Sequence, residues 1–298
     1  MPRVSLIITT YDSARYLAAA IESVLAQAVE LECLVVDDAS KDETQAVLSN
    51  VRDARLRVLT NAENLGPYAS ANRALDVATG DFIARLDADD VCLPGRLEQQ
   101  LAFFDAHQTV GLLGGACVRI DEAGQTLGAQ PVPESDLAIR LRCLVSPPFV
   151  HSTVMWRRSL GLRYDGAMRL AGDYELWTRA LDVTRAANLS EPLVQYRVWS
   201  GGISSRHRLL QRSLHDAIAA AWCARQWPSL GLEATAFATL RDWCARGGDT
   251  PLPPPAHRLV SALREAVLGP APSTTALETF ARAMFSAPGT WGQPTPTA

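Results

Sequence analysis

The chain has 298 residues, 48% of them apolar and 20% charged, a balance typical of a soluble globular protein with one large domain or two modest ones. Its net charge of −4 at pH 7 provides no overall basic field, which argues against nucleic acid as the main partner. No apolar stretch is as long as a membrane span, and the N-terminus lacks the layout of a signal peptide, so we expect a cytoplasmic protein.

Short apolar strands alternate with helical patterns in the first half of the chain. The pattern predicts strands over residues 4–9, 31–36, 56–60 and 81–86. It predicts helices over residues 13–25, 67–78 and 94–108, and a short helix that ends near residue 49. This alternating order predicts an α/β fold with a mainly parallel sheet and helices on both of its faces.

Polar side chains follow each of these four strands at the point where the strand ends. The four clusters are Thr9–Tyr11, Asp37–Asp38, Asn61–Asn64 and Asp87–Asp90. In open α/β sheets ligands bind at the carboxyl ends of the strands. We therefore expect the clusters to meet at one edge of the sheet, with Asp37 better suited to a turn or cap role than to ligand binding.

The second half of the chain has a mixed pattern up to about residue 204 and a helical one beyond it. The sequence predicts a hairpin at Asp121–Gly124, a helix around residues 173–181, a strand over 192–199 and a linker near 249–255. Basic residues begin the helical region, at positions 206, 207, 208 and 212. A membrane-surface or partner-docking helix would use them, but a solvated basic face on a packed helix is the more common arrangement.

The stretch "GDFIARLDADD" ends an apolar strand in three carboxylates within four residues, Asp87, Asp89 and Asp90. These charges repel one another, so a positive group is expected beside them. Mg²⁺ or Mn²⁺ fits this requirement, since both bind one or two carboxylates and complete their shell with water and substrate phosphates. A solvated turn in which one aspartate caps the next helix is the alternative.

The number of lysines and the spacing of the cysteines exclude some classes of catalytic and metal site. Lys41 is the only lysine, so any function that needs a dedicated lysine must use it. The six cysteines have no C-x-x-C spacing and are predicted to be reduced thiols, most of them in the core. Residues Asp87–Val91 fit the D-x-D-x-[TV] motif of haloacid-dehalogenase-like phosphatases. That family needs a lysine after the motif, and none follows Asp87, which counts against a phosphatase.

Residues 3 to about 205 resemble the family 2 glycosyltransferases. The matching segments are "VSLIITTYDSARYLAAAIESVLAQ", "LECLVVDDASKDET", "NAENLGPYASANRAL", "GDFIARLDADDVCLPGRLEQQ", "HSTVMWRR", "AGDYELWTRA" and "YRVWSGGIS". The resemblance implies a Rossmann-like GT-A domain over residues 1–204, with a nucleotide-sugar half over about 1–118 and an acceptor half over about 119–204. Residues 205–298 would then form a helical C-terminal extension.

The resemblance also assigns residues to the binding of a nucleotide-sugar, most simply a UDP-sugar. Thr9 and Tyr11 fall where the family contacts the base, and an aromatic ring there suits base stacking. Asp38 falls where the family accepts the imino hydrogen of the base. Asp87 falls near the ribose and the metal, and Asp89 on the direct ligand of Mn²⁺ or Mg²⁺, which would neutralise the diphosphate.

Asp173 in "AGDYELW" aligns with the catalytic base of the family, which deprotonates the acceptor hydroxyl so that attack inverts the anomeric configuration. A helix N-cap is the alternative role for this residue. The chain departs from the family twice, with Gly172 where a glutamate usually precedes the base and Trp199 where many members carry a histidine that binds the metal or the diphosphate. His151 is expected to have a packing role.

The implied reaction is transfer of a sugar to a hydroxyl of a glycan or lipid-linked acceptor, in the synthesis of a bacterial surface polysaccharide. Such an enzyme would be cytoplasmic and could contact the inner face of the membrane peripherally, without a nucleic-acid partner. The two departures from the family leave a second reading open, a catalytically idle protein that binds nucleotide-sugars or acts as a scaffold.

Overall fold

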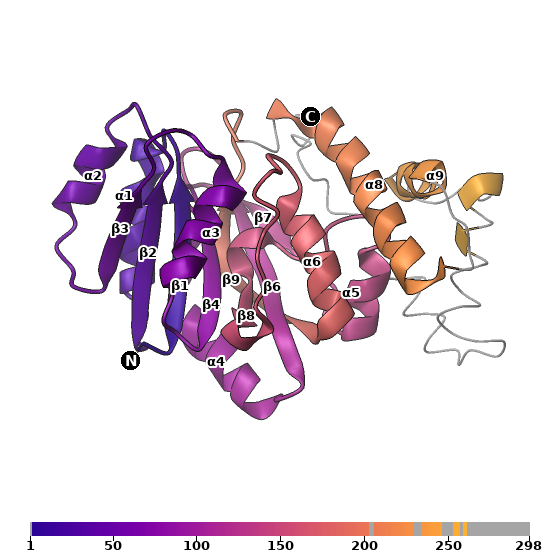
Figure 1. Ribbon diagram of the computed structural model, residues 1–298, viewed down its shortest axis with the longest axis horizontal. Helices are drawn as coiled ribbons and strands as arrows, with labels where there is room; N and C mark the ends of the chain where they lie inside the picture. The colour runs from indigo at the N-terminus through magenta and orange to yellow at the C-terminus, as the bar shows by residue number, and fades with distance from the viewer. Residues whose placement is uncertain (1, 203–205, 229–233, 246–252, 257–258, 261–298) are drawn as a thin grey trace. The chain divides into compact units, whose positions relative to one another are not determined.

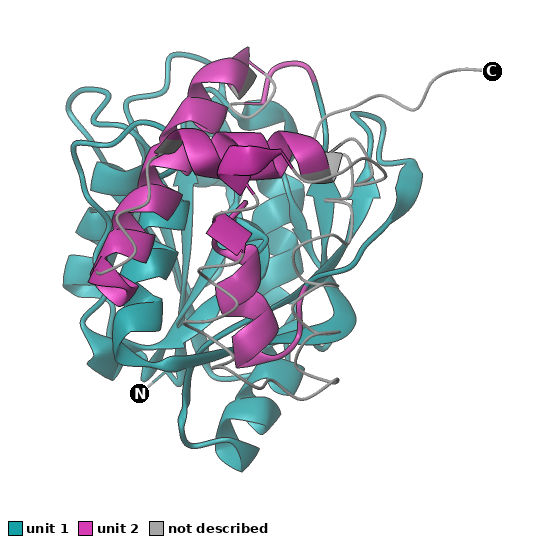
Figure 2. Cartoon of the chain, turned by 90° about the vertical axis from the view of Figure 1, so that its right-hand side faces the viewer, with its two compact units in different colours: residues 1–132, 149–199 teal, residues 133–148, 200–298 magenta. Residues whose placement is uncertain are grey.

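The computed structural model of the protein describes residues 2–202, 206–228, 234–245, 253–256 and 259–260. The chain divides into two compact units, one of residues 1–132 and 149–199 and the other of residues 133–148 and 200–298 (Figure 2). The sequence pattern places a boundary at residue 204, whereas in this division residues 133–148 also group with the C-terminal part. Most of the linker expected near 249–255 lies outside the described residues.

The first unit begins with four parallel strands in the order β3-β2-β1-β4, shown side by side in Figure 1. The strands are β1 (Val4–Thr10), β2 (Leu31–Asp37), β3 (Leu56–Thr60) and β4 (Phe82–Asp87). The helices between them are α1 (Ala14–Leu25), α2 (Thr44–Asn50) and α3 (Pro67–Val77). The predicted βαβ order and parallel pairing of this half are confirmed.

The rest of the first unit extends the same sheet in the order β4-β8-β6-β9-β5, with β7 paired to β6. Its strands are β5 (Val91–Cys92), β6 (Val110–Ile120), β7 (Thr126–Gln130), β8 (Met155–Arg157) and β9 (Arg185–Arg197). Its helices are α4 (Arg96–Ala106), α6 (Gly172–Val183) and the short η1 (His151–Thr153) and η2 (Arg158–Leu160). Strand β8 lies antiparallel to both of its neighbours, so the sheet is parallel in its first half and mixed in its second.

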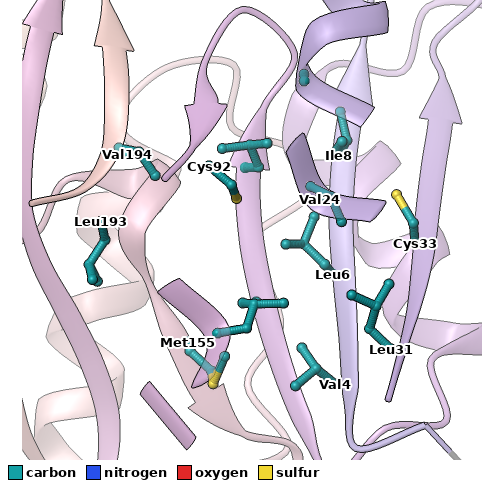
Figure 3. Close-up of a cluster of buried hydrophobic side chains, with 14 of the residues drawn as sticks. Val4, Leu6, Ile8, Val24, Leu31, Cys33, Cys92, Met155, Leu193 and Val194 are labelled. Carbon is teal, nitrogen blue, oxygen red and sulfur yellow. The ribbon is translucent and has the colours of Figure 1, made fainter. Parts of the chain in front are cut away.

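A core of buried side chains lies on one face of the sheet, where Val4, Leu6 and Ile8 of β1 pack with Val24 of α1 (Figure 3). Successive side chains of a strand point to opposite faces, so Ile7, which is also buried, points the other way. Burial on both faces explains why this strand reads as a continuous apolar run in the sequence. The described cysteines are free and buried, which confirms the expected core thiols among them.

The start of β4 is fixed against β1 by a close contact between their backbones. The N–H of Gly80 donates a hydrogen bond to Oγ of Ser5 at 2.8 Å, and a Cβ at position 80 would lie 2.6 Å from the Ser5 nitrogen. Glu32 of β2 joins the two segments of this contact, because its Oε1 accepts hydrogen bonds from Oγ of Ser5 in β1 and from the N–H of Thr79, which precedes Gly80. The resulting register pairs Thr9 at the end of β1 with Asp87 at the end of β4.

The second unit contains α5 (Asp136–Arg142), α8 (Arg208–Gln226) and α9 (Ala234–Ala245). Helices α8 and α9 pack against each other, with Trp222 and Phe237 buried and an ion pair between Asp216 and Arg241. The helical C-terminal region predicted from the sequence is confirmed where it is described. Within those residues, no helix is both long enough and apolar enough to cross a membrane.

Candidate active site at the carboxyl ends of β1, β2 and β4

The loop that follows β3 is tied to the end of β2 by Asp38. This carboxylate is only 3% exposed and accepts hydrogen bonds from Nδ2 of Asn61 at 2.6 Å and from the N–H groups of Leu65 and Gly66 at 2.8 Å. Its neighbour Asp37 accepts a hydrogen bond from the N–H of Ser40, which confirms the expected turn role of Asp37. The clusters after β2 and β3 therefore meet, as predicted. Contact of Asp38 with a base stays a prediction.

The clusters after β1 and β4 also meet, through Arg85. The guanidinium of this buried residue donates to Oγ1 of Thr9 at 3.2 Å and lies 3.5 Å from Oδ1 of Asp87. Tyr11, two residues beyond Thr9, is 42% exposed and so offers an accessible aromatic face at this edge. The structure therefore gathers the residues predicted to contact the base and ribose at the ends of adjacent strands.

Asp87 is held by two positively charged or polarised partners. Besides Arg85, Nδ1 of His151 lies 3.2 Å from Oδ1 of Asp87. Partial burial would raise the pKa of Asp87, but the imidazole of His151 and then the guanidinium of Arg85 hold this pKa well below its usual range. Asp87 is therefore ionised at every physiological pH.

The other two carboxylates of the motif have separate partners. Trp199 Nε1 donates to Oδ2 of Asp89 at 2.8 Å. Asp90 is buried, and it accepts hydrogen bonds from the Ser152 hydroxyl and from the N–H of Arg197. Burial, and then repulsion by the neighbouring carboxylates, raises the pKa of Asp89 and of Asp90. Partners from β4, η1 and the end of β9 therefore offset only part of the electrostatic cost of three adjacent carboxylates.

His151 is the site residue that sequence reasoning missed, because a packing role was expected for it. Its ring does pack against Tyr164 and Trp177. In addition, a carboxylate only accepts hydrogen bonds, so Nδ1 of His151 carries the proton that faces Asp87. In the neutral imidazole, Nε2 accepts from the hydroxyl of Tyr164 at 2.9 Å. The signal available in the sequence was a lone histidine inside the otherwise apolar segment "PFVHSTVMW".

Asp173 lies in the first turn of α6, after an N-terminus at Ala171 and Gly172, so it is not the N-cap. An acidic residue in the first turn interacts favourably with the helix dipole. Oδ1 of Asp173 accepts a hydrogen bond from the hydroxyl of Tyr68 at 3.1 Å. The Tyr68 ring stacks on that of Tyr164 at 5.3 Å between centroids, which connects Asp173 to His151 and Asp87 through one network of side chains.

The residues of the motif fit a divalent cation that is shared with a substrate. Among the described residues, no group of three or more histidine, cysteine, aspartate or glutamate side chains is arranged to hold a metal. One oxygen each of Asp87 and Asp89 is engaged by protein donors, and the indole of Trp199 has no ligand atom to offer. Mg²⁺ and Mn²⁺ are commonly bound through one or two carboxylates, with phosphates and water as the other ligands. Asp87 and Asp89 could provide the carboxylates of such a set.

Comparison with known proteins places this geometry in a family. The family model "Glycosyl transferase family 2" matches residues 5–161. The succinoglycan biosynthesis protein ExoO of Rhizobium meliloti (strain 1021) is 32% identical over 246 residues, which cover 74% of this chain and 67% of ExoO. WfgD of Escherichia coli, named as a UDP-Glc:alpha-D-GlcNAc-diphosphoundecaprenol beta-1,3-glucosyltransferase, is 29% identical over 76% of this chain and 85% of its own length.

Solved structures share the fold. The S. aureus TarS 1–349 complex with UDP-GlcNAc has a TM-score of 0.58 at 21% identity, covering 97% of this chain and 90% of that one. The mannosyltransferase PcManGT from Pyrobaculum calidifontis, in complex with GDP-Man and Mn²⁺, has a TM-score of 0.55 at 20% identity and covers 98% and 88% of the two chains. With its GT-A-like sheet and the family match across more than half of its length, the chain belongs to glycosyl transferase family 2.

Proposed function

We propose that this protein is an inverting, metal-dependent glycosyltransferase that moves a sugar from a UDP-sugar to a hydroxyl of a glycan or lipid-linked acceptor in the synthesis of a bacterial surface polysaccharide. The names of ExoO and WfgD and the UDP-GlcNAc complex of TarS support this choice of donor and pathway. The observation that carries the proposal is the network that joins Asp87 at the end of β4 to Asp173 at the start of α6.

The donor is proposed to lie along the ends of β1, β2 and β4. Tyr11 offers an exposed ring for stacking on the base, and Thr9 offers a hydroxyl beside it. Asp38 is buried and holds the loop after β3 by hydrogen bonds, so it is proposed to accept from the base with the acceptor capacity that these hydrogen bonds leave. Asp87 and Asp89 are proposed to hold the divalent cation together with the diphosphate. When bound there, the cation would neutralise charge on the leaving group.

Asp173 is proposed to act as the general base. As the acceptor oxygen bonds to the anomeric carbon, the bond from that carbon to the diphosphate oxygen breaks, and the acceptor proton moves to the carboxylate of Asp173. Attack from the side opposite the leaving group inverts the anomeric configuration. The position of Asp173 in the first turn of α6, held by Tyr68, supports this role because a positioned carboxylate is what proton transfer requires.

The test is Asp173→Asn, assayed after a screen of nucleotide-sugars, with and without Mn²⁺, for thermal stabilisation and nucleoside diphosphate release. We expect sugar transfer to fall at least a thousandfold while UDP binding, measured by calorimetry, stays within about twofold. Asp182→Asn, an exposed carboxylate near the other end of α6, is the matched control and should retain full activity. Undiminished transfer by Asp173→Asn would remove the base assignment.

Catalytic idleness remains the second candidate, favoured by Trp199 and Gly172 at positions where the family usually carries functional side chains. It predicts UDP binding without turnover for any acceptor. A phosphatase has no support from the comparisons, which match a different family. The cytoplasmic location and the peripheral membrane contact of the C-terminal helices stay predictions.

A further inference from the structure

The aromatic ring of Tyr68 lies where a side chain at position 172 would otherwise be. A Cβ built on Gly172 would lie 2.7 Å from Cδ2 and Cε2 of Tyr68, closer than side-chain carbons approach in real structures. The ring of Tyr68 therefore fills the volume into which any larger side chain at position 172 would point. The space beside Gly172 of α6 is thus filled by the ring of Tyr68, which belongs to α3.

The same tyrosine presents its hydroxyl to Asp173. Burial, and then the negative charge of Asp173, holds the pKa of Tyr68 well above its usual value, so the phenol keeps its proton. A protonated phenol next to a carboxylate is a hydrogen-bond donor, and its distance to Oδ1 of Asp173 is 3.1 Å. This bond uses one carboxylate oxygen and fixes the direction in which the other one points.

The position of the Tyr68 ring is itself fixed from its other side. The ring of Tyr164 stacks on it, with the two planes 23° apart. Tyr164 is buried and its hydroxyl is bound to Nε2 of His151, so it does not move freely. A side chain that is held on both faces and carries a single polar atom can place that atom with little loss of conformational entropy.

From these contacts we propose that Tyr68 is a positioning residue for Asp173, whose carboxylate its hydroxyl orients. The role rests on the proposed function, because it has meaning only if Asp173 accepts the acceptor proton. Tyr68 donates to Oδ1, and Oδ2 is left to face the acceptor hydroxyl. Tyr68 itself does not take part in the proton transfer.

The test is Tyr68→Phe, which keeps the ring, its stacking on Tyr164 and its fit against Gly172, and removes only the hydroxyl. We expect kcat, expressed per UDP-binding site, to fall about tenfold, with the KM for the nucleotide-sugar unchanged and the melting temperature lowered by no more than the loss of one hydrogen bond explains. A residue with a structural role alone would lower the melting temperature and the number of binding sites but leave kcat per binding site unchanged. Unchanged kcat in Tyr68→Phe would overturn the proposal.

Two further variants make the outcome specific. Tyr16→Phe is the matched control, since it removes a buried phenolic hydroxyl that has no hydrogen-bond partner within the described part of the chain, and its kcat should stay within about twofold of wild type. Asp173→Asn separates the two levels of the argument. If it retains activity, the proposed base is wrong; if it is inactive while Tyr68→Phe matches wild type, only the role of Tyr68 is wrong.

The close contact between Gly172 and the ring of Tyr68 allows an independent test by double mutation. Gly172→Ala should push the Tyr68 ring away from Asp173 and lower kcat in the wild-type background. In a Tyr68→Ala background the ring is absent, so the same substitution should cost nothing further, and the two effects should be non-additive. Additive losses in kcat would contradict the proposed coupling.

Discussion

Trp199 and Asp89 form a hydrogen bond across 110 positions of the sequence, from the indole Nε1 to Oδ2 at 2.8 Å. Asp89 is also the neighbour of two other carboxylates, and this bond offsets part of the burial and repulsion that raise its pKa. The tryptophan therefore does not leave a gap where many family members carry a histidine. It donates a hydrogen bond to the Asp89 carboxylate, whereas a histidine would offer a nitrogen that can bind a metal.

Trp199→Phe keeps an aromatic ring and removes this donor. We expect the Mn²⁺ concentration required for half-maximal binding in the presence of UDP to rise about tenfold, because hydrogen bonds to metal-binding side chains typically contribute that much to metal affinity. Electron paramagnetic resonance of free Mn²⁺ in a titration with protein and UDP measures this directly. Equal Mn²⁺ affinity in Trp199→Phe and wild type would show that the bond does not orient Asp89 for the cation.

Trp199→His should have the opposite effect on the free protein. An imidazole nitrogen is a metal ligand, whereas an indole N–H is not. We expect Mn²⁺ binding without UDP to become at least several-fold tighter than in wild type, measured by the same resonance titration. No gain in affinity would mean that the side chain at position 199 does not reach the cation.

His151→Phe tests whether the contact with Asp87 matters beyond packing. The substitution keeps an aromatic ring beside Trp177 but removes the donor to Asp87 and the acceptor for Tyr164. We expect UDP affinity, measured by calorimetry, to fall about fivefold to tenfold, because Asp87 then keeps only Arg85 beside its Oδ1 and its orientation is less well fixed. His107→Phe, on an exposed residue at the end of α4, is the control and should bind UDP normally. Unchanged affinity in His151→Phe would assign it to packing alone.

Gly80→Ala tests the backbone contact that aligns β4 with β1. The added methyl would meet the Ser5 nitrogen at 2.6 Å and the Val4 carbonyl carbon at 2.7 Å, and backbone atoms inside a sheet cannot move aside cheaply. We expect the free energy of unfolding in urea to fall by about 2–3 kcal/mol. Gly166→Ala is the control, since its methyl would find only ordinary contacts at 3.6 Å or more. Equal stability of the two variants would show that the strands readjust.

Glu32→Gln tests the same contact as a function of pH. Partial burial raises the pKa of Glu32, but the hydrogen bonds from Ser5 and Thr79 outweigh it and lower this pKa overall. A folded-state pKa below the unfolded one stabilises the protein above the unfolded value, and this stabilisation is lost as the pH falls through the folded-state pKa. We expect Glu32→Gln to cost about 1–2 kcal/mol at pH 7 and progressively less below pH of about 4, in urea titrations at each pH.

The control for this pH dependence is Glu63→Gln, at an exposed position. It should change the free energy of unfolding by less than about 0.5 kcal/mol at every pH of the titration series. A Glu32→Gln deficit that stays constant down to pH 3 would mean that the charge of Glu32 contributes nothing. The deficit would then come from hydrogen-bond geometry alone.

The first four strands and the meeting of their carboxyl ends could be predicted because each strand shows a local pattern, a short, largely apolar run followed by a polar turn. Strand β8 could not, since Met155–Arg157 is too short to show a period, and its antiparallel insertion beside β4 is what brings His151 to Asp87. The bond from Tyr68 to Asp173 joins residues 105 positions apart. Such pairs depend on how the helices and strands pack together, so they cannot be predicted from a short stretch of sequence.

The Ser152 hydroxyl accepts a hydrogen bond from the backbone N–H of Asp87 and donates one to Asp90, while Arg197 binds the Asp89 carbonyl and Asp90 from the other side. The turn between β4 and β5 is thus anchored at both ends before any donor arrives. Little conformational freedom remains to be lost there on binding. Association with the nucleotide-sugar should accordingly proceed in a single concentration-dependent phase, with no slow step in which this turn becomes ordered.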